Sequence, residues 1–283
     1  MKEAMTNKVL ILGSGTSTGI PIPGCECKVC QSTHFKNKRL RTSIILKIQN
    51  PNQEEELSFL IDTTPDLRQG LLSHKIKKID ACIITHTHAD HLHGIDDLRP
   101  LCFGPPPKTI PLYTSQKFSE EIESRFPYIF GEQANRPQIG GGIPRLLTKK
   151  IEFSEKINRV NLHGINFEFF LLPHGHGESI GFRQGKFAYL IDCHDIPEVI
   201  VDYLKSINLE LLIIDCVCRA PHRTHLNIDK SFYFIKKINP DRAGLIHMGH
   251  DIDHFELETE ARKDFGEAVG PVFDNQILTY RND

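Results

Sequence analysis

The stretch Thr85-His86-Thr87-His88-Ala89-Asp90-His91 directly follows an apolar run at residues 81–84. A buried strand is therefore expected to end where four candidate metal ligands begin. The first two histidines can converge on one cation from a loop, and the aspartate and the last histidine, one turn further on, can face a second cation. Imidazole and carboxylate ligands together suit Zn, Mn or Fe. This stretch therefore predicts a metal site.

The same stretch resembles the histidine–x–histidine–x–aspartate–histidine signature of the metallo-β-lactamase superfamily. The resemblance implies an α/β fold, namely a four-layer αββα sandwich with metals at the edge between two sheets. It also implies that later ligands are isolated histidines and a bridging aspartate at strand ends. The chain supplies candidates in that order: His174 after the apolar run 165–172, Asp192 after 187–191, and His247 after 244–246.

Carried over position by position, the resemblance implies a dinuclear centre. His86, His88 and His174 would bind one metal, Asp90, His91 and His247 the other, and Asp192 would bridge them. His176 competes with His174, which is favoured because its distance to Gly181-Phe182-Arg183 resembles the spacing in related hydrolases. Asp62, at the end of the run 57–61, resembles a buried aspartate of the family that orients a metal-binding histidine.

A second cluster, Cys25, Cys27 and Cys30, places three thiols within six residues. In a reducing compartment this density indicates one tetrahedral metal ion rather than disulfides. Such a site needs a fourth ligand, and the spacing leaves two candidates open. His34 would complete a local knuckle, whereas His250, three residues after His247, would tie the cysteine loop to the edge that carries the metals.

The start Gly13-Ser14-Gly15-Thr16, the cysteine loop and the stretch His247-Met248-Gly249-His250 together resemble the cyclic phosphodiesterase branch of the superfamily. That branch is typified by the phosphonate-pathway enzyme that opens a ribosyl cyclic phosphate. The resemblance covers residues 8–275. It implies a structural zinc held by three cysteines and a C-terminal histidine, and so favours Cys25, Cys27, Cys30 and His250 as the ligands.

The predicted mechanism is attack on phosphorus by a hydroxide that the two divalent metals activate. No Ser-His-Asp order or nucleophile elbow offers a protein nucleophile. By resemblance His225, within residues 220–227, corresponds to the branch's substrate-contacting histidine, which could bond the phosphate or protonate the leaving oxygen. His222 competes for this role, and Asp90 is expected to act in catalysis as well as in metal binding. Arg183 and Arg219 are weaker candidates for binding phosphate.

Composition restricts the class of partner. The chain has 283 residues, a formal net charge of -2 and 15 histidines. This charge disfavours binding to nucleic acid through bulk electrostatics, without excluding it. The polar start has no apolar segment of a secretory signal, and no apolar run could span a bilayer, so membrane partners are not expected and the predicted location is the cytoplasm.

Apolar runs predict strands at 9–12, 43–48, 57–61, 81–84, 165–172, 187–191, 211–214, 244–246 and 276–280, with helices at 66–73, 115–124, 197–205, 228–237 and 255–264. We expect one domain over residues 1–283, with a zinc loop at 24–34. The Pro/Gly-rich stretch 125–147 is either a lid insertion or a solvated connection.

The leading hypothesis is a metal-dependent hydrolase, with two Zn, Mn or Fe ions and one structural Zn, that cleaves a small-molecule or cyclic phosphodiester. The alternatives are an RNA-processing nuclease resembling the tRNA 3′-end enzymes, a thioester hydrolase of the same fold, and a metal-binding module without activity. The sequence leaves the oligomeric state open between a monomer and a homodimer.

Overall fold

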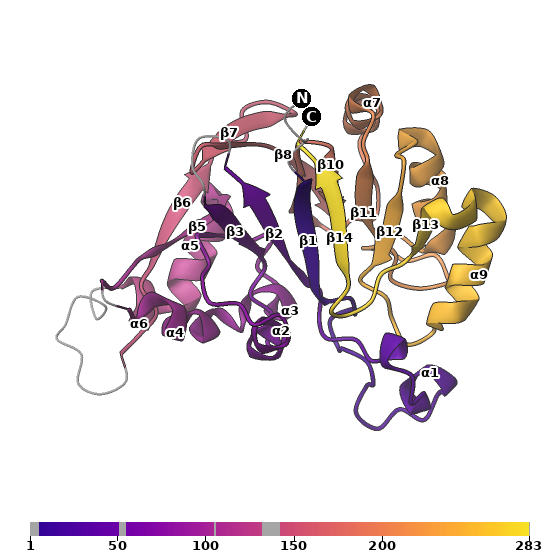
Figure 1. The fold of residues 1–283 in the computed structure, drawn as a ribbon, viewed down its shortest axis with the longest axis horizontal. Helices are drawn as coiled ribbons and strands as arrows, with labels where there is room; N and C mark the ends of the chain where they lie inside the picture. The colour runs from indigo at the N-terminus through magenta and orange to yellow at the C-terminus, as the bar shows by residue number, and fades with distance from the viewer. Residues whose placement is uncertain (1–5, 51–54, 105, 132–141, 283) are drawn as a thin grey trace.

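The computed structural model describes residues 6–50, 55–104, 106–131 and 142–282. Two seven-stranded sheets face each other, and helices cover their outer faces (Figure 1). The strand order is β14-β1-β2-β3-β4-β5-β6 in the first sheet and β13-β12-β11-β10-β9-β8-β7 in the second. The predicted αββα sandwich is confirmed.

The elements alternate along the chain as an α/β protein requires. The first sheet contains β1 (Thr6–Gly13), β2 (Ser43–Gln49), β3 (Glu56–Ile61), β4 (Ala81–Ile83), β5 (Ile110–Ser115), β6 (Leu146–Ile151) and β14 (Ile277–Arg281). The second contains β7 (Asn158–Leu162), β8 (Ile165–His174), β9 (Gly177–Gln184), β10 (Phe187–Leu190), β11 (Leu211–Asp215), β12 (Ala243–Ile246) and β13 (Val269–Pro271). The helices are α1 (Lys28–Gln31), α2 (Leu67–Ser73), α3 (Ala89–Leu92), α4 (Arg99–Cys102), α5 (Gln116–Arg125), α6 (Pro127–Phe130), α7 (Glu198–Ile207), α8 (Ile228–Ile238) and α9 (His254–Phe265).

Continuous apolar strands arise because both faces of each sheet are covered. In β11, Leu211 and Ile213 belong to the core between the sheets, whereas Leu212 and Ile214 belong to the core under the outer helices. All five residues of β11 are buried. The first sheet has its own outer core, to which β2 contributes Ile45. These buried layers explain why period-two alternation is lost from the central strands.

The five predicted helices correspond to α2, α5, α7, α8 and α9, with ends shifted by a few residues. Asn227 is the N-cap of α8, because its Oδ1 accepts a hydrogen bond from the Lys230 amide at 3.3 Å. The nine predicted strands are also found. The strands that the pattern did not predict are β5, β6, β7, β9 and β13.

Parallel pairing brings several strand ends to one edge. In the first sheet β3, β4, β5 and β6 run parallel, and in the second β10, β11, β12 and β13 do so. Ligands of open α/β sheets bind beyond the carboxyl ends of such strands. The loops that follow β3, β4, β10, β11 and β12 carry the polar residues described below.

Two further predictions from the sequence concern a lid at residues 125–147 and the absence of a membrane-spanning segment. Within 125–147, the described parts comprise the end of α5, the short helix α6 and the start of β6, and residues 132–141 lie outside the described residues. The lid therefore stays a prediction. Among the described residues, no helix is both long and apolar enough to cross a membrane.

His254, a buried histidine at the start of α9, should make the free energy of unfolding depend on pH. Burial, with the charges of Lys36 and Arg39, lowers the pKa of His254 to about 3. In the unfolded chain its pKa is about 6.5, so the unfolded state alone takes up a proton as the pH falls below that value. The contribution of neutral His254 to the free energy of unfolding is therefore fully present above pH ~6.5 and decreases as the pH falls towards ~3. At pH ~5 this contribution is already smaller by about 2 kcal/mol.

Urea unfolding at two pH values tests this expectation. His254→Phe should lose less stability than the unmodified chain on going from neutral to mildly acidic buffer. His176→Gln, at an exposed position, should behave like the unmodified chain. An equal acid sensitivity in His254→Phe and the unmodified chain would contradict the assignment.

Candidate metal centre

The loop after β4 is fixed by a buried carboxylate. Asp62 accepts hydrogen bonds from the Thr85 amide at 2.7 Å, from Thr85 Oγ1 at 2.8 Å and from His91 Nδ1 at 2.8 Å. Thr85 Oγ1 in turn lies 3.1 Å from His86 Nδ1. Asp62 thus holds Nδ1 of both histidines, directly or through the threonine, and leaves each Nε2 directed elsewhere. This is the orienting role that the sequence predicted for Asp62.

Three imidazoles meet at the end of β4 and β8. His86 Nε2 lies 3.0 Å and His174 Nε2 lies 3.3 Å from His88 Nδ1. Two nitrogens bound to one tetrahedral Zn are about 3.3 Å apart, because each Zn–N bond is ~2.0–2.1 Å. His174 Nδ1 donates to the Thr224 carbonyl at 2.9 Å, so its Nε2 carries the lone pair that a cation needs.

A second group joins the first through Asp192. His91 Nε2 lies 3.2 Å from both Asp90 Oδ2 and Asp192 Oδ2, and His247 Nε2 lies 3.5 Å from Asp192 Oδ1. Asp192 Oδ2 also lies 3.4 Å from His86 Nε2, in the first group. The carboxylate that the sequence expected to bridge two metals therefore stands between the two ligand groups.

The residues fit a pair of cations. His91 Nε2, His247 Nε2 and Asp192 Oδ1 are buried and have no hydrogen-bond partner among the residues that the structure describes. Buried polar atoms in folded proteins are almost always paired, so these atoms need another partner. Asp62, Asp192 and His247 also have φ angles of 64°, 48° and 65°. Such left-handed conformations are costly outside glycine and gather at functional sites.

The electrostatics of the site favour positive charge. Burial opposes protonation of His91, but the carboxylates of Asp192 and Asp62 raise its pKa well above the usual range. In the same way, burial is outweighed by Asp192, Asp215 and Asp90, and the pKa of His247 rises to about 10. Burial lowers the pKa of His86 well below its usual value, which keeps that imidazole neutral. The buried carboxylates that favour a proton on His91 and His247 would equally attract a divalent cation, which would take the place of that proton on the imidazole nitrogen.

His225 lies beside both groups. Its ring centroid is 4.9 Å from that of His174 and 4.9 Å from that of His247. Its Nδ1 donates to Asp215 Oδ2 at 3.0 Å. The rival His222 is exposed, and its Nδ1 accepts from the Thr224 amide at 3.3 Å within its own loop.

The other rivals lie elsewhere. His176 is exposed and belongs to neither ligand group in the described part of the chain. The weaker phosphate candidates are engaged by carboxylates: Arg183 pairs with Glu168, and Arg219 Nη1 lies 2.9 Å from Glu260 Oε1. Their guanidinium groups are satisfied away from the histidines, so the expectation that they bind phosphate is not supported by the geometry.

Sequence reasoning missed Asp215. It ends the apolar run of β11 as Asp192 follows that of β10, and its buried carboxylate contacts His225 and His247. The signal was available, because an acidic residue at the carboxyl end of a buried strand is the same pattern that singled out Asp192.

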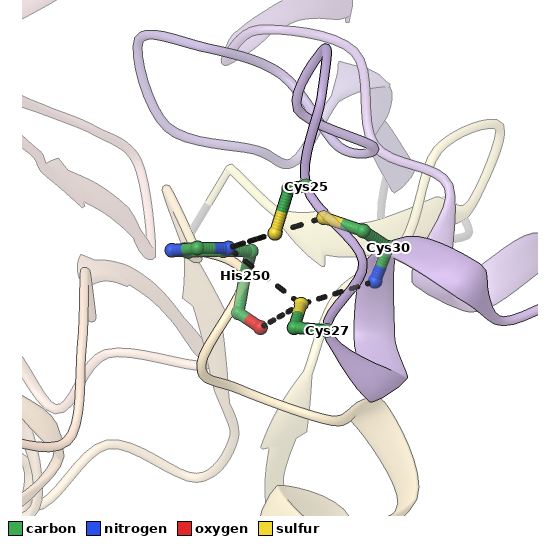
Figure 2. A group of neighbouring side chains, drawn as sticks. All are labelled: Cys25, Cys27, Cys30 and His250. Carbon is green, nitrogen blue, oxygen red and sulfur yellow. Dashed lines mark hydrogen bonds between the residues drawn. The ribbon is translucent and has the colours of Figure 1, made fainter.

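A second candidate centre lies at the N-terminal loop (Figure 2). His250 Nδ1 lies 3.2, 3.6 and 3.9 Å from the sulfur atoms of Cys25, Cys27 and Cys30. Sulfur and nitrogen bound to one tetrahedral Zn are about 3.6 Å apart, given Zn–S ~2.3 Å. The amide of Cys30 donates to Cys27 Sγ and lowers the pKa of that thiol to about 6. This set of donors fits a zinc ion.

His34 does not join the cysteines. Its Nδ1 accepts from the Lys36 amide at 3.2 Å, and its ring stacks on Phe35 at 4.8 Å between centroids. Of the two candidates for the fourth ligand, the structure brings only His250 to the thiols.

One turn connects the two centres, because His247 and His250 lie three residues apart. The Met248 amide donates to the Ser14 carbonyl at 3.0 Å, and the Thr16 amide donates to the Met248 carbonyl at 3.2 Å. The buried Arg39 donates from Nη1 to the Gly249 carbonyl at 2.9 Å. The Gly-rich start therefore supports this turn through backbone hydrogen bonds.

Residues 58–248 match the family model described as a beta-lactamase superfamily domain. A solved diphosphatase of the PhnP family is 32% identical, with 98% of each chain covered and a TM-score of 0.84. Human tRNase Z, short form, is 16% identical, with 96% of this chain and 98% of that chain covered and a TM-score of 0.62, a likeness of fold.

One curated relative is an octanoyltransferase from Porphyromonas gingivalis. It is 32% identical over 254 residues, which are 88% of this chain and 48% of that protein. The chain spans less than half the length of the curated relatives that it matches.

Proposed function

The chain belongs to the beta-lactamase superfamily, and from this membership we propose that it is a dinuclear-metal hydrolase of small or cyclic phosphodiesters. The observation that carries the proposal is the pair of ligand groups joined by Asp192, with His225 beside both. The 32% identity to a diphosphatase of the PhnP family supports a phosphorus-containing substrate.

The two ligand groups would hold one divalent cation each. His86, His88 and His174 would hold the first cation, Asp90, His91 and His247 the second, and Asp192 would contact both. When bound, the cations would supply Lewis acidity towards phosphoryl oxygens and a nucleophilic hydroxide at neutral pH. The mixed imidazole and carboxylate donors accept Zn, Mn and Fe.

Two residues beside the cations would accept and donate the protons that the reaction moves. As the oxygen of water forms a bond to phosphorus, the bond to the leaving oxygen breaks. Asp90, whose carboxylate is more accessible than that of Asp192, would accept the proton that the attacking water loses and would later release it to solvent. His225, which the structure places against His174 and His247, would give a proton to the leaving alkoxide and later regain one from solvent.

The cysteine site would hold a structural zinc. Cys25, Cys27, Cys30 and His250 provide four donors and leave no open position for substrate, as in closed structural sites. Its role would be to fasten the N-terminal loop to the turn that carries His247.

Turnover of bis-p-nitrophenyl phosphate tests the reaction class. We expect cleavage that a chelator abolishes and that added Zn or Mn restores, because the hydroxide depends on the cations. A pre-tRNA should be cleaved much more slowly, since the net charge of -2 offers little attraction for RNA. Rapid cleavage of the pre-tRNA, with the diester untouched, would overturn the proposal.

A second candidate, a thioester hydrolase, is favoured by one observation. The match to an octanoyltransferase covers 88% of this chain. Because the match spans only 48% of that protein, the transferase activity can reside in its other half. An octanoyl thioester assayed beside the diester separates the two candidates, since preference for the thioester would support the second.

A further inference from the structure

Asp215 is a fully buried carboxylate that no part of the proposed mechanism yet uses. Its Oδ2 accepts a hydrogen bond from His225 Nδ1 at 3.0 Å, and its Oδ1 lies 3.3 Å from His247 Nδ1. The amide of Cys193 donates to Oδ2 at 3.3 Å. A buried charge is costly unless partners compensate it, so this position has a specific purpose.

We propose that Asp215 is a positioning residue, which keeps a proton on Nδ1 of His225 and directs Nε2 towards the reacting phosphate. The inference rests on the proposed phosphodiesterase function. A carboxylate can only accept a hydrogen bond, so its partner Nδ1 must carry the hydrogen. The bond made by one ring nitrogen of a histidine sets the role of the other nitrogen.

The position of the ring supports this role. One ring nitrogen of His225 lies within 4.8 Å of ligand atoms of both His174 and Asp192. His225 therefore reaches the junction of the two ligand groups, where the phosphorus of a substrate would lie. Without Asp215 the ring could rotate or change tautomer, and Nε2 would lose its alignment with the leaving oxygen.

The consequence depends on the leaving group. An alkoxide requires a proton as the phosphorus–oxygen bond breaks, whereas p-nitrophenolate leaves as a stable anion. A positioned general acid contributes about 10²–10⁴-fold to rate. Loss of Asp215 should therefore slow the release of an alkoxide much more than the release of p-nitrophenolate.

The experiment compares Asp215→Asn with the unmodified chain on two substrates, a nucleoside 2′,3′-cyclic phosphate and bis-p-nitrophenyl phosphate. We expect kcat to fall about 100-fold or more with the cyclic phosphate and less than about 10-fold with the nitrophenyl diester, with unchanged metal content. Adding His225→Gln to Asp215→Asn should cost little more, since the two residues act as a unit. Asp80→Asn, at the opposite end of β4, is the matched control.

Three results would overturn the proposal: equal losses on both substrates, loss of a catalytic metal from Asp215→Asn, or additive effects in the double variant. Metal loss would instead make Asp215 a support of His247. Should Asp215→Asn fail to fold, ¹⁵N NMR of histidine in the unmodified chain decides, with His225→Gln used for assignment.

A protonated, hydrogen-bonded Nδ1 of His225 is the expected signal, and an unprotonated Nδ1 would refute the proposal. This measurement also distinguishes a failure of the proposed phosphodiesterase function from a failure of the proposed role of Asp215. If the unmodified chain cleaves neither diester, the proposed function fails, whereas the state of Nδ1 still tests the contact with Asp215.

Discussion

His88→Ala is expected to lower kcat/KM for bis-p-nitrophenyl phosphate by about 10³-fold or more, because it removes one of the three proposed ligands of a cation that would generate the nucleophile. His88 is exposed, whereas His86 and His174 are buried. Truncating an exposed side chain leaves no cavity in a core, so the fold should survive. The loss of activity should therefore be accompanied by loss of metal and not by unfolding.

Elemental analysis and calorimetry complete that experiment. The variant should contain about one catalytic metal fewer than the unmodified chain and should melt at a similar temperature when both are stripped of metal. His176→Ala is the matched control, since it is an exposed histidine near His174 outside both ligand groups. Cleavage retained in His88→Ala would refute the assignment of the metal site.

The composition of each strand decides whether the sequence alone could predict it. Apolar runs such as β2 and β11 are buried on both faces, and their composition alone identifies them as strands. β9 (Gly177–Gln184) contains two glycines and polar residues, and its pairing comes from its neighbours β8 and β10. Such a strand owes its conformation to tertiary context, which no local pattern contains.

The ligand groups were predictable for a different reason. His86, His88, Asp90 and His91 lie together in the sequence, and a chance cluster of this kind is rare. Asp192 and His247 came from a resemblance, as single residues at strand ends. The contact between Asp215 and His225 could not be predicted because it depends on how the loop after β11 folds back onto the strand end. The engagement of Arg219 by Glu260 is equally a matter of tertiary structure.

The sandwich also explains how two distant clusters come to share a turn. β1 and β12 belong to different sheets, yet their following loops meet where Gly15 pairs with Met248. The turn after β12 supplies His247 to one centre and His250 to the other. A change at the cysteine site therefore has a short covalent path to the proposed catalytic centre.

Cys27→Ser should show this connection. A serine hydroxyl is a poor zinc ligand beside a thiolate, so the variant should lose about one zinc per chain. Structural zinc binding contributes folding free energy, and a loss of about 3–5 kcal/mol would lower Tm by roughly 10 °C in a protein of this size. Cys27 is only partly buried, so the substitution itself removes little core packing.

Controls locate the effect in the metal site. Cys218→Ser changes another partly buried thiol outside the cluster, and His34→Gln removes the rival fourth ligand. Both should keep the full zinc count and nearly unchanged Tm. Because His250 is tethered to His247 through two residues, Cys27→Ser should also lose activity while it keeps its catalytic metals. An unchanged zinc count in Cys27→Ser would mean that the three thiols and His250 lie together for packing alone.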